Sequence, residues 1–451
     1  MRVARGFLIA LALAATAACG APESNGEGSA NAAVAGDPSS ATPSAASTAD
    51  STADSTADST GRPPAPALST VPKGAAVSGP LGDGPTEDGE SRSGTSQGGG
   101  SRLESGPGAV PATVPAADAS HTRVVETHAD GRLMLERTGG VMGTSMRLVA
   151  IGRDRAALEI ALVAAEAELR RVEDLMTDWR ASPLMDLNAA AGSGPVAVPT
   201  ELGRLVERSL LVAELSGGAF DPTWRGVGTL WKLRADPPVV PDDAAIAAGL
   251  ERVDFRRVAV TTDAAREVYT VELPAGFELG LGGIAKGYGV DRAMTVLMEH
   301  GVEHAVVDAG GDLKALGQHF DGPWEVAIRH PRRQAGERGD VMAVVPVSNA
   351  CVVTSGDYER FVVIDGVRHH HILDPRTGRP STGCMSATVV GPDAAVCDAL
   401  ATALCVLGPD DGLALIERSG AYQALAVGMD GEVRTTAGLA SATRESATRD
   451  R

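Results

Sequence analysis

The chain has 451 residues, of which 43% are hydrophobic, 3% aromatic and 22% charged, and its formal net charge is −18 at pH 7. No long basic run occurs along the sequence, which argues against nucleic acid as a partner. About 330 residues remain from Thr122 onward, after a low-complexity first quarter, and this length suits one large domain or two intimate lobes.

The first 18 residues are typical of an export signal. Arg2 and Arg5 precede an apolar run over 6–18 that is too short to span a bilayer. Cys19 follows Thr16-Ala17-Ala18, which predicts a bacterial lipoprotein that is cut before this cysteine and acylated on it. The leucine usually found three residues before the cysteine is absent, and an ordinary soluble export signal remains the alternative. We expect a protein of the cell envelope, lipid-anchored and facing the periplasm or the cell exterior.

Residues 19–121 form a segment rich in Ser, Ala, Gly, Pro and Thr. From Gly20 to His121 it contains no Phe, Trp, Tyr, Ile, Met or Cys, and it has 12 acidic and 4 basic residues. Such a composition buries too little apolar surface to offset the entropy of the chain, which predicts disorder. We interpret the segment as a tether between the acylated cysteine and a catalytic domain, although a spacer of no particular role is equally consistent with its composition.

Hydrophobic periodicity beyond the tether predicts a mixed α/β or α+β fold, with much antiparallel pairing in the second half. We expect a catalytic domain over 122–437 and a flexible tail over 438–451. Helices are predicted at 153–179, 201–215, 285–299, 393–407 and 411–418. Strands are predicted at 302–307, 324–328, 341–347, 360–364, 367–373, 385–390 and 424–427. Asp365-Gly366 and Asp430-Gly431 are signals for hairpin turns.

The segment from Gly280 to Ala285 fits the pattern G-x-G-x-x-A and opens a predicted helix. With Asp308 at the end of the next predicted strand, it resembles a dinucleotide-binding fingerprint. Its position in mid-chain, without a second βαβ unit after it, argues against a dehydrogenase. The loop still suits a close approach of the backbone to phosphate, with Lys286 at the helix start. Tight helix packing through small residues is the alternative explanation.

Asp398 and Thr402 are four residues apart in a predicted helix and therefore share one face. A carboxylate and a hydroxyl present two hard oxygens to a small cation such as Mg²⁺. The hydroxyl could equally bond back to the carbonyl of Asp398. Three histidines, 369–371, lie just upstream in a predicted strand, where alternation would place His369 and His371 on one face and His370 on the other. A histidine there could act as a general base, or the triplet could lie on the surface.

Four cysteines follow Cys19, and none of them has the close spacing of metal ligands. They are Cys351, Cys384, Cys397 and Cys405. Cys397 and Cys405 share one predicted helix and are most simply buried thiols. A disulfide among the four is compatible with an oxidising compartment, but the sequence does not identify a pair.

Eight short motifs between Met142 and Leu407 resemble, in order, those of the ApbE family, the FAD:protein FMN transferases of bacterial envelopes. They are Met142-Gly143-Thr144; Met176-Thr177-Asp178-Trp179 with Ser182 and Leu187-Asn188; Gly218-Ala219-Phe220-Asp221-Pro222-Thr223; Gly282-Gly283-Ile284-Ala285-Lys286-Gly287-Tyr288; Asp308-Ala309-Gly310-Gly311-Asp312; Ser355-Gly356-Asp357-Tyr358; His370-His371-Ile372-Leu373-Asp374-Pro375-Arg376-Thr377-Gly378; and Asp398-Ala399-Leu400-Ala401-Thr402. The resemblance covers most of the part predicted to fold.

The resemblance implies a single large α+β domain that passes FMN from FAD to a threonine or serine of another protein and releases AMP. It implies Mg²⁺, or Mn²⁺ in its place, with Asp398, Thr402 and the carbonyl of Gly283 as ligands, and His371 as the base. By resemblance, seven residues lie along the FAD: Met142, Trp179, Ala219, Phe220, Asp221, Lys286 and Ile372. Gly280 stands where the family usually has an aspartate, so that residue's contact to the flavin nucleotide is not carried over.

The expected partners are FAD and acceptor flavoproteins of the membrane or periplasm, with the membrane reached through the lipid anchor. Two other functions use the same residues. An FAD pyrophosphatase would use water as the acceptor and give FMN and AMP. A flavin-binding lipoprotein without chemistry would retain FAD and release no AMP.

Overall fold

The structure is a computed structural model of the chain, and it describes residues 8–9, 120–263, 268–442 and 444–445. The predicted tether lies outside the described residues except for Ser120 and His121, and so does the predicted export signal except for Leu8–Ile9. Of the predicted tail over 438–451, the structure describes only the residues within α9 (Ala437–Ala442) and β20 (Arg444–Glu445). Within these described ranges, no helix is both long enough and apolar enough to cross a membrane.

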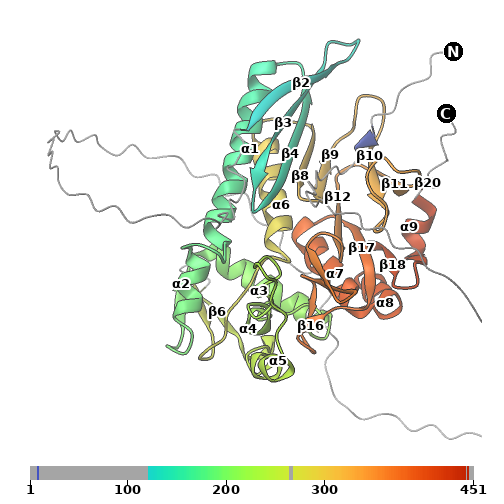
Figure 1. Cartoon of the computed structure of the whole chain (residues 1–451). Helices are drawn as coiled ribbons and strands as arrows, with labels where there is room; N and C mark the ends of the chain where they lie inside the picture. Colours follow the sequence, from blue (N-terminus) through green and yellow to red (C-terminus); the bar gives the residue numbers. More distant parts are fainter. Residues whose placement is uncertain (1–7, 10–119, 264–267, 443, 446–451) are drawn as a thin grey trace, which may run out of the picture. The chain divides into compact units, whose positions relative to one another are not determined.

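Nine strands of the described residues form one sheet, and each pairs antiparallel with its neighbours (Figure 1). In spatial order they are β19 (Val433–Thr435), β18 (Gln423–Gly428), β17 (Cys384–Gly391), β12 (Ala350–Gly356), β9 (Asp312–Leu316), β8 (His304–Ala309), β4 (Thr144–Gly152), β3 (Leu133–Val141) and β2 (His121–Thr127). The predicted α+β class is confirmed. The strand that follows the Gly280 loop, β8, pairs antiparallel on both sides, which rules out the parallel βαβ unit of a dinucleotide fold.

Smaller sheets of the described residues surround this one. β10 (Trp324–Arg329) and β11 (Val341–Val347) pair with each other and with β1 (Leu8–Ile9) and β20. A second group contains β5 (Val196–Val198), β7 (Val268–Glu272) and β6 (Ala259–Asp263). Two short hairpins consist of β13 (Phe361–Ile364) with β14 (Val367–His370), and β15 (Leu373–Asp374) with β16 (Arg379–Pro380).

Strands of the large sheet send alternate side chains into two separate cores. In β4, Leu148 and Ala150 belong to one core, whereas Val149 and Ile151 belong to the other. The alternation follows from the two-residue period of a strand. The first core lies against helices and the second lies against β10 and β11, so the large sheet is buried on both faces.

The helices of the described residues pack mostly on the first core, except that Leu439 of the C-terminal helix belongs to the second core. They are α1 (Arg155–Met176), α2 (Pro183–Ala189), α3 (Thr200–Leu215), α4 (Arg225–Gly228), α5 (Asp243–Leu250), α6 (Ala285–Glu299), α7 (Ala394–Leu407), α8 (Pro409–Ser419) and α9. Asp154 and Asp393 cap α1 and α7, each accepting a hydrogen bond from the backbone N–H three residues on. Figure 1 shows α1 and α6 alongside the strands of the first half and α7 beside β12 and β17.

Helices α6 and α7 approach closely because Gly287 has no side chain. A Cβ at this position would lie 2.1 Å from the backbone oxygen of Ala394. Asp291, one turn further along α6, accepts hydrogen bonds from the backbone N–H groups of Ala394 and Ala395 at the start of α7. This contact brings the face of α7 that carries Asp398 against the first turn of α6.

One predicted strand is wrong in its extent. The predicted strand over 367–373 ends at His370, and Leu373 begins a separate short strand. The backbone N–H of His371 donates to the carbonyl of Arg360, which is the next pair in the register after Phe361 and His370, and the pairing of the hairpin ends there. The expected alternation of His369 and His371 on one strand face therefore does not apply.

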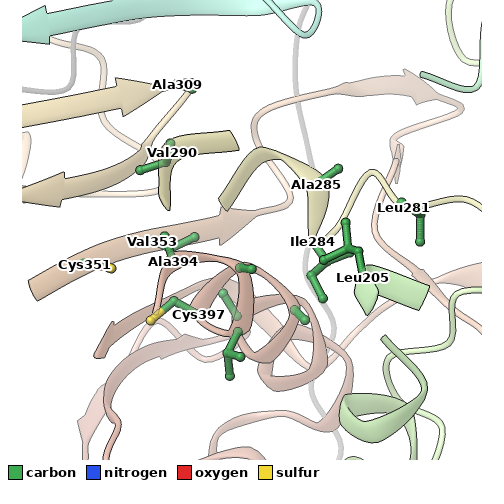
Figure 2. Close-up of a cluster of buried hydrophobic side chains, with 14 of the residues drawn as sticks. Leu205, Leu281, Ile284, Ala285, Val290, Ala309, Cys351, Val353, Ala394 and Cys397 are labelled. Carbon is green, nitrogen blue, oxygen red and sulfur yellow. The ribbon is translucent and has the colours of Figure 1, made fainter. Parts of the chain in front are cut away.

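All four cysteines in the described residues are free and buried. Figure 2 shows Cys397 of α7 near Cys351 of β12, among apolar side chains that include Val353 and Ala394. Burial and the neighbouring Cys351 raise the pKa of Cys397 well above its ordinary value, so the thiol is protonated and unreactive. The cysteines therefore pack as small apolar residues.

Candidate active site

One cavity of about 470 Å³ lies where α6, α7, the Phe220 loop and the two short hairpins meet, a volume in the usual range for small-molecule sites. Its wall contains nine of the eleven predicted site residues. They are Ala219, Phe220, Asp221, Gly283, Lys286, His371, Ile372, Asp398 and Thr402. These residues come from four segments far apart in the sequence, and the structure brings them to one place.

A cluster of two carboxylates and one ammonium group adjoins the cavity, whose wall includes Lys286 and Asp398 but not Asp312. Lys286 Nζ lies 2.6 Å from Asp312 Oδ2 and 3.4 Å from each carboxylate oxygen of Asp398. The backbone N–H of Gly287 also donates to Asp398 Oδ2, at 3.3 Å. The side chains of Asp312 and Asp398 are 1% and 3% exposed. Two buried carboxyl groups therefore share one ammonium group.

The pKa values of this cluster reflect that imbalance. Burial and the neighbouring Asp398 raise the pKa of Asp312 well above its ordinary value. Burial alone would lower the pKa of Lys286, but the carboxylates of Asp312 and Asp398 outweigh it and raise the pKa. The ammonium is therefore permanently charged, and a further cation at the cluster would relieve the repulsion between the two acids.

The donor set next to Asp398 fits a small hard cation. A Cβ on Gly283 would lie 3.4 Å from Thr402 Oγ1 and 3.2 Å from the ring of Phe220, so only glycine leaves this space open. Thr402 Oγ1 lies 3.4 Å from Ser355 Oγ. The Thr402 hydroxyl therefore contacts the Ser355 hydroxyl. It does not form the hydrogen bond to the carbonyl of Asp398 that was the alternative expected from the sequence. A carboxylate, a hydroxyl and a backbone carbonyl are oxygen ligands of the kind that Mg²⁺ takes.

A purely side-chain metal site is not available elsewhere in the part of the chain that the structure describes. The described residues contain no group of three or more His, Cys, Asp or Glu side chains that could hold a metal ion. A cation at Asp398 would therefore complete its shell with the hydroxyl, the carbonyl, water and oxygens of the substrate.

The ring of His371 has a fixed orientation at the cavity wall. Its Nδ1 lies 3.3 Å from the carbonyl oxygen of Arg360, which can only accept, so Nδ1 carries the hydrogen and Nε2 keeps its lone pair. Burial of the ring and the nearby guanidinium of Arg360 lower the pKa of His371. The side chain is also exposed to the cavity, whose water limits this shift. His371 is thus neutral at pH 7 and able to accept a proton at Nε2.

The other two histidines of the triplet have different surroundings. His370 is buried, and its Nε2 lies 2.9 Å from the carbonyl oxygen of Ser381, so it supports the hairpin rather than the cavity. Burial lowers the pKa of His370 and keeps it neutral. The ring of His369 lies at a tilt to that of Trp231, with centroids 5.7 Å apart. Of the three histidines, only His371 lines the cavity.

Asp221 is committed to holding its own loop. Its Oδ1 accepts from the backbone N–H and the hydroxyl of Thr223, at 2.8 and 2.6 Å, and its Oδ2 accepts from the N–H of Phe255 at 3.1 Å. Burial raises the pKa of this carboxyl group. These bonds fix the loop that brings Phe220 and Ala219 to the cavity wall.

Two predicted site residues do not reach the cavity wall. Met142 is buried with φ 52°, its N–H donates to Glu173 Oε2 at 2.9 Å, and its side chain packs against Gly289 of α6. Trp179, just beyond α1, is 60% exposed. In this structure neither of them lines the cavity.

Trp224 lines the cavity and was not predicted. Its Nε1 donates to the carbonyl of Gly280 at 3.0 Å, and a Cβ on Gly280 would lie 2.7 Å from this nitrogen. The indole therefore occupies the space in which a side chain at position 280 would lie. The sequence signal was present, because Trp224 directly follows the motif that ends at Thr223.

The loop after α4 contributes a second unpredicted group. Trp231, Lys232 and Arg234 line the cavity, and Arg360 joins them from the start of the β13–β14 hairpin. Trp231 Nε1 donates to the carbonyl of Gly378 at 2.9 Å, which attaches the loop to the β15–β16 hairpin. The chain has only four tryptophans, and two of them, Trp224 and Trp231, lie within eight residues. This clustering is the feature of the sequence that could have identified the loop.

Comparison with known proteins gives one consistent result. The model of the ApbE family matches residues 142–426. An FAD:protein FMN transferase of Treponema pallidum is 41% identical over 275 residues, which is 58% of this chain and 75% of that protein. One of Klebsiella pneumoniae is 31% identical and covers 68% of this chain and 85% of that protein. The crystal structure of the ApbE protein of Thermotoga maritima has a TM-score of 0.61 at 32% identity and covers 69% of this chain and 99% of that one.

The charge cluster generates a stability prediction. Lys286→Met leaves two buried carboxylates without their cation, and we expect the free energy of unfolding to fall by about 3–5 kcal/mol. Adding Asp312→Asn should restore much of the loss. Denaturant titration at pH 7 measures both. The matched control is Arg155→Met, which removes an exposed i,i+4 pair with Glu159 and should change stability by less than about 0.5 kcal/mol. Equal stability of Lys286→Met and the wild type would refute the electrostatic account.

Proposed function

The chain belongs to the ApbE family and is a transferase of the FAD:protein FMN type, and we propose that it moves FMN to a threonine or serine hydroxyl with Mg²⁺ and releases AMP. The observation that carries the proposal is one cavity that is lined both by the carboxylate of Asp398 and by a neutral, oriented histidine at position 371. Cation and base are the two elements that transfer of a phosphoryl-linked group requires.

The proposed reaction balances without a further reactant. The hydroxyl oxygen of the acceptor attacks the phosphorus of the FMN half of FAD. The bond from this phosphorus to the bridging oxygen breaks, and the electron pair leaves with that oxygen as part of AMP. The proton of the hydroxyl passes to Nε2 of His371. The products are a phosphodiester between FMN and the acceptor, and AMP.

His371 is suited to the base role because its tautomer is fixed. The carbonyl of Arg360 engages Nδ1 and thereby leaves the Nε2 lone pair available. A pKa below the ordinary histidine range keeps the ring unprotonated at neutral pH, at some cost in basicity. Exposure of the side chain gives an incoming hydroxyl access to it.

We propose Asp398, Thr402 and the carbonyl of Gly283 as the protein ligands of Mg²⁺, or of Mn²⁺ in its place. The bound ion would neutralise charge on the pyrophosphate oxygens of FAD. Lys286 holds the Asp398 carboxylate in place, and Phe220, Ala219 and Ile372 offer an apolar wall to the flavin nucleotide. The use of water instead of a protein hydroxyl would make the same site an FAD pyrophosphatase.

The cation site is tested by Asp398→Asn, which keeps the shape of the side chain but removes its charge. We expect transfer of FMN to a soluble acceptor flavoprotein to fall at least about 10²-fold, and added Mg²⁺ should no longer stimulate it. Covalent flavin is read as fluorescence on a denaturing gel, with AMP measured in parallel. AMP release at the same rate without any acceptor would favour hydrolysis. Full Mg²⁺-dependent transfer by the variant would refute the ligand assignment.

The base is tested by His371→Ala. Transfer should slow by about 10²–10⁴-fold, the usual contribution of a positioned base, while FAD binding stays within twofold of wild type. His370→Ala is the matched control: it removes a buried hydrogen bond to Ser381, so the melting temperature should drop while the folded protein still transfers. Normal transfer by His371→Ala together with loss in folded His370→Ala would reverse the assignment.

We also propose a lipid-anchored location in the cell envelope, with acceptors that are membrane or periplasmic flavoproteins. The support is the export signal and Cys19 in the sequence. A flexible tether of about a hundred residues would span roughly 50–60 Å and so reach acceptors at different heights above the bilayer.

Replacing the acylated residue tests the anchor. We expect Cys19→Ser to move the protein from the membrane fraction to the soluble fraction, because a lipid chain supplies the membrane affinity. Immunoblotting of fractionated cells measures the change, and Cys351→Ser, a buried cysteine far along the chain, is the control. An unchanged membrane fraction would show that Cys19 is not the anchor.

A further inference from the structure

The cavity wall contains two chemically different groups of charged side chains. One consists of Asp398 and of Lys286, which pairs with the buried Asp312, as described above. The other carries three cations, Lys232 and Arg234 from the loop after α4 and Arg360 from the start of the β13–β14 hairpin. All three side chains are exposed, so their charged groups are free to meet a ligand that enters.

These three cations lack the carboxylate partners that other basic residues of the protein have. Within the described residues, no aspartate or glutamate lies at ion-pair distance from Lys232, Arg234 or Arg360. Arg225, at the start of α4, pairs with Asp178 at 2.7 Å and Glu278 at 2.9 Å.

Arg234 and Arg360 also act on each other. Burial and the positive charge of Arg234 both lower the pKa of Arg360, so the two guanidinium groups are close enough to repel. The negative charges of Glu359 and Asp178 act in the opposite direction but do not prevent the lowering of the pKa, so positive charge still repels positive charge here, and a bound anion would relieve that repulsion. Guanidinium groups in particular match the geometry of phosphate oxygens.

We propose that Lys232, Arg234 and Arg360 form an anion subsite for a nucleotide phosphate, and that it selects phosphorylated flavin and adenine nucleotides over riboflavin and adenosine. The inference rests on the proposed function, since FAD carries two such phosphates. A cation at Asp398 and these basic residues would then both contact the pyrophosphate. The subsite would also bind the negative charge that develops as the bridging oxygen leaves.

The test measures binding rather than turnover. Arg234→Gln/Arg360→Gln is compared with wild type in the full chain by titration calorimetry with AMP, FMN, adenosine and riboflavin. Arg360→Gln keeps the backbone carbonyl that orients His371. The matched control is Arg155→Gln/Arg256→Gln, which makes the same charge change at two exposed arginines outside the cavity.

We expect the double variant to weaken binding of AMP, FMN or both by about 10–100-fold, since each lost charge-assisted hydrogen bond costs roughly a factor of ten. Riboflavin and adenosine should bind within about twofold of wild type. Loss confined to AMP assigns the subsite to the leaving phosphate, and loss confined to FMN assigns it to the transferred phosphate. Unchanged AMP and FMN binding, or equal losses for adenosine and riboflavin, would overturn the proposal.

This experiment separates the inference from the function on which it rests. If phosphate selectivity depends on the two arginines while no acceptor ever receives FMN, the subsite is supported and the transferase reaction is refuted. If FMN is transferred but the variants bind AMP and FMN as wild type does, the subsite is refuted and the transferase reaction is supported.

Discussion

The charge cluster of Lys286, Asp312 and Asp398 is the constraint on which the site depends. Its members come from the first turn of α6, from β9 and from α7, so one set of polar contacts ties the two central helices to the sheet. The close approach of the helices at Gly287 makes the cluster possible, because any larger residue would push Asp398 away from Lys286. Because two acidic side chains share one ammonium group here, this is the place where we propose that a cation binds.

Much of this could be predicted from sequence because it is local. The helix predicted over 285–299 matches α6, since apolar spacing and Gly301 define it, and Asp365-Gly366 marks the turn between β13 and β14. Asp398 and Thr402 were found as a pair because helical spacing places them on one face. The resemblance to a known family then joined motifs that no periodicity argument connects.

The remainder depends on contacts between distant segments, which periodicity does not report. The strand expected over 367–373 ends at His370, and the hydrogen bond from His371 to Arg360 is the last one in the register of the hairpin. Trp231, Lys232 and Arg234 lie in a loop that only its composition distinguishes in the sequence. Their position depends on the hydrogen bond from Trp231 to the carbonyl of Gly378. Gly280 stands where the family usually has an aspartate, and the sequence does not show what replaces that side chain. In the structure the indole of Trp224, from another segment, occupies the space.

The β13–β14 hairpin has a consequence for how this enzyme can change over evolution. Arg360 and His371 are its two ends, and two contacts to the Arg360 carbonyl hold them together. Its outer part exposes Val363 and Val367, at 58% and 55%, away from this junction. Substitutions or insertions near the turn leave the spacing between the proposed base and the neighbouring cation intact. The surface beside the proposed base can therefore diversify while the spacing between His371 and Arg360 is kept.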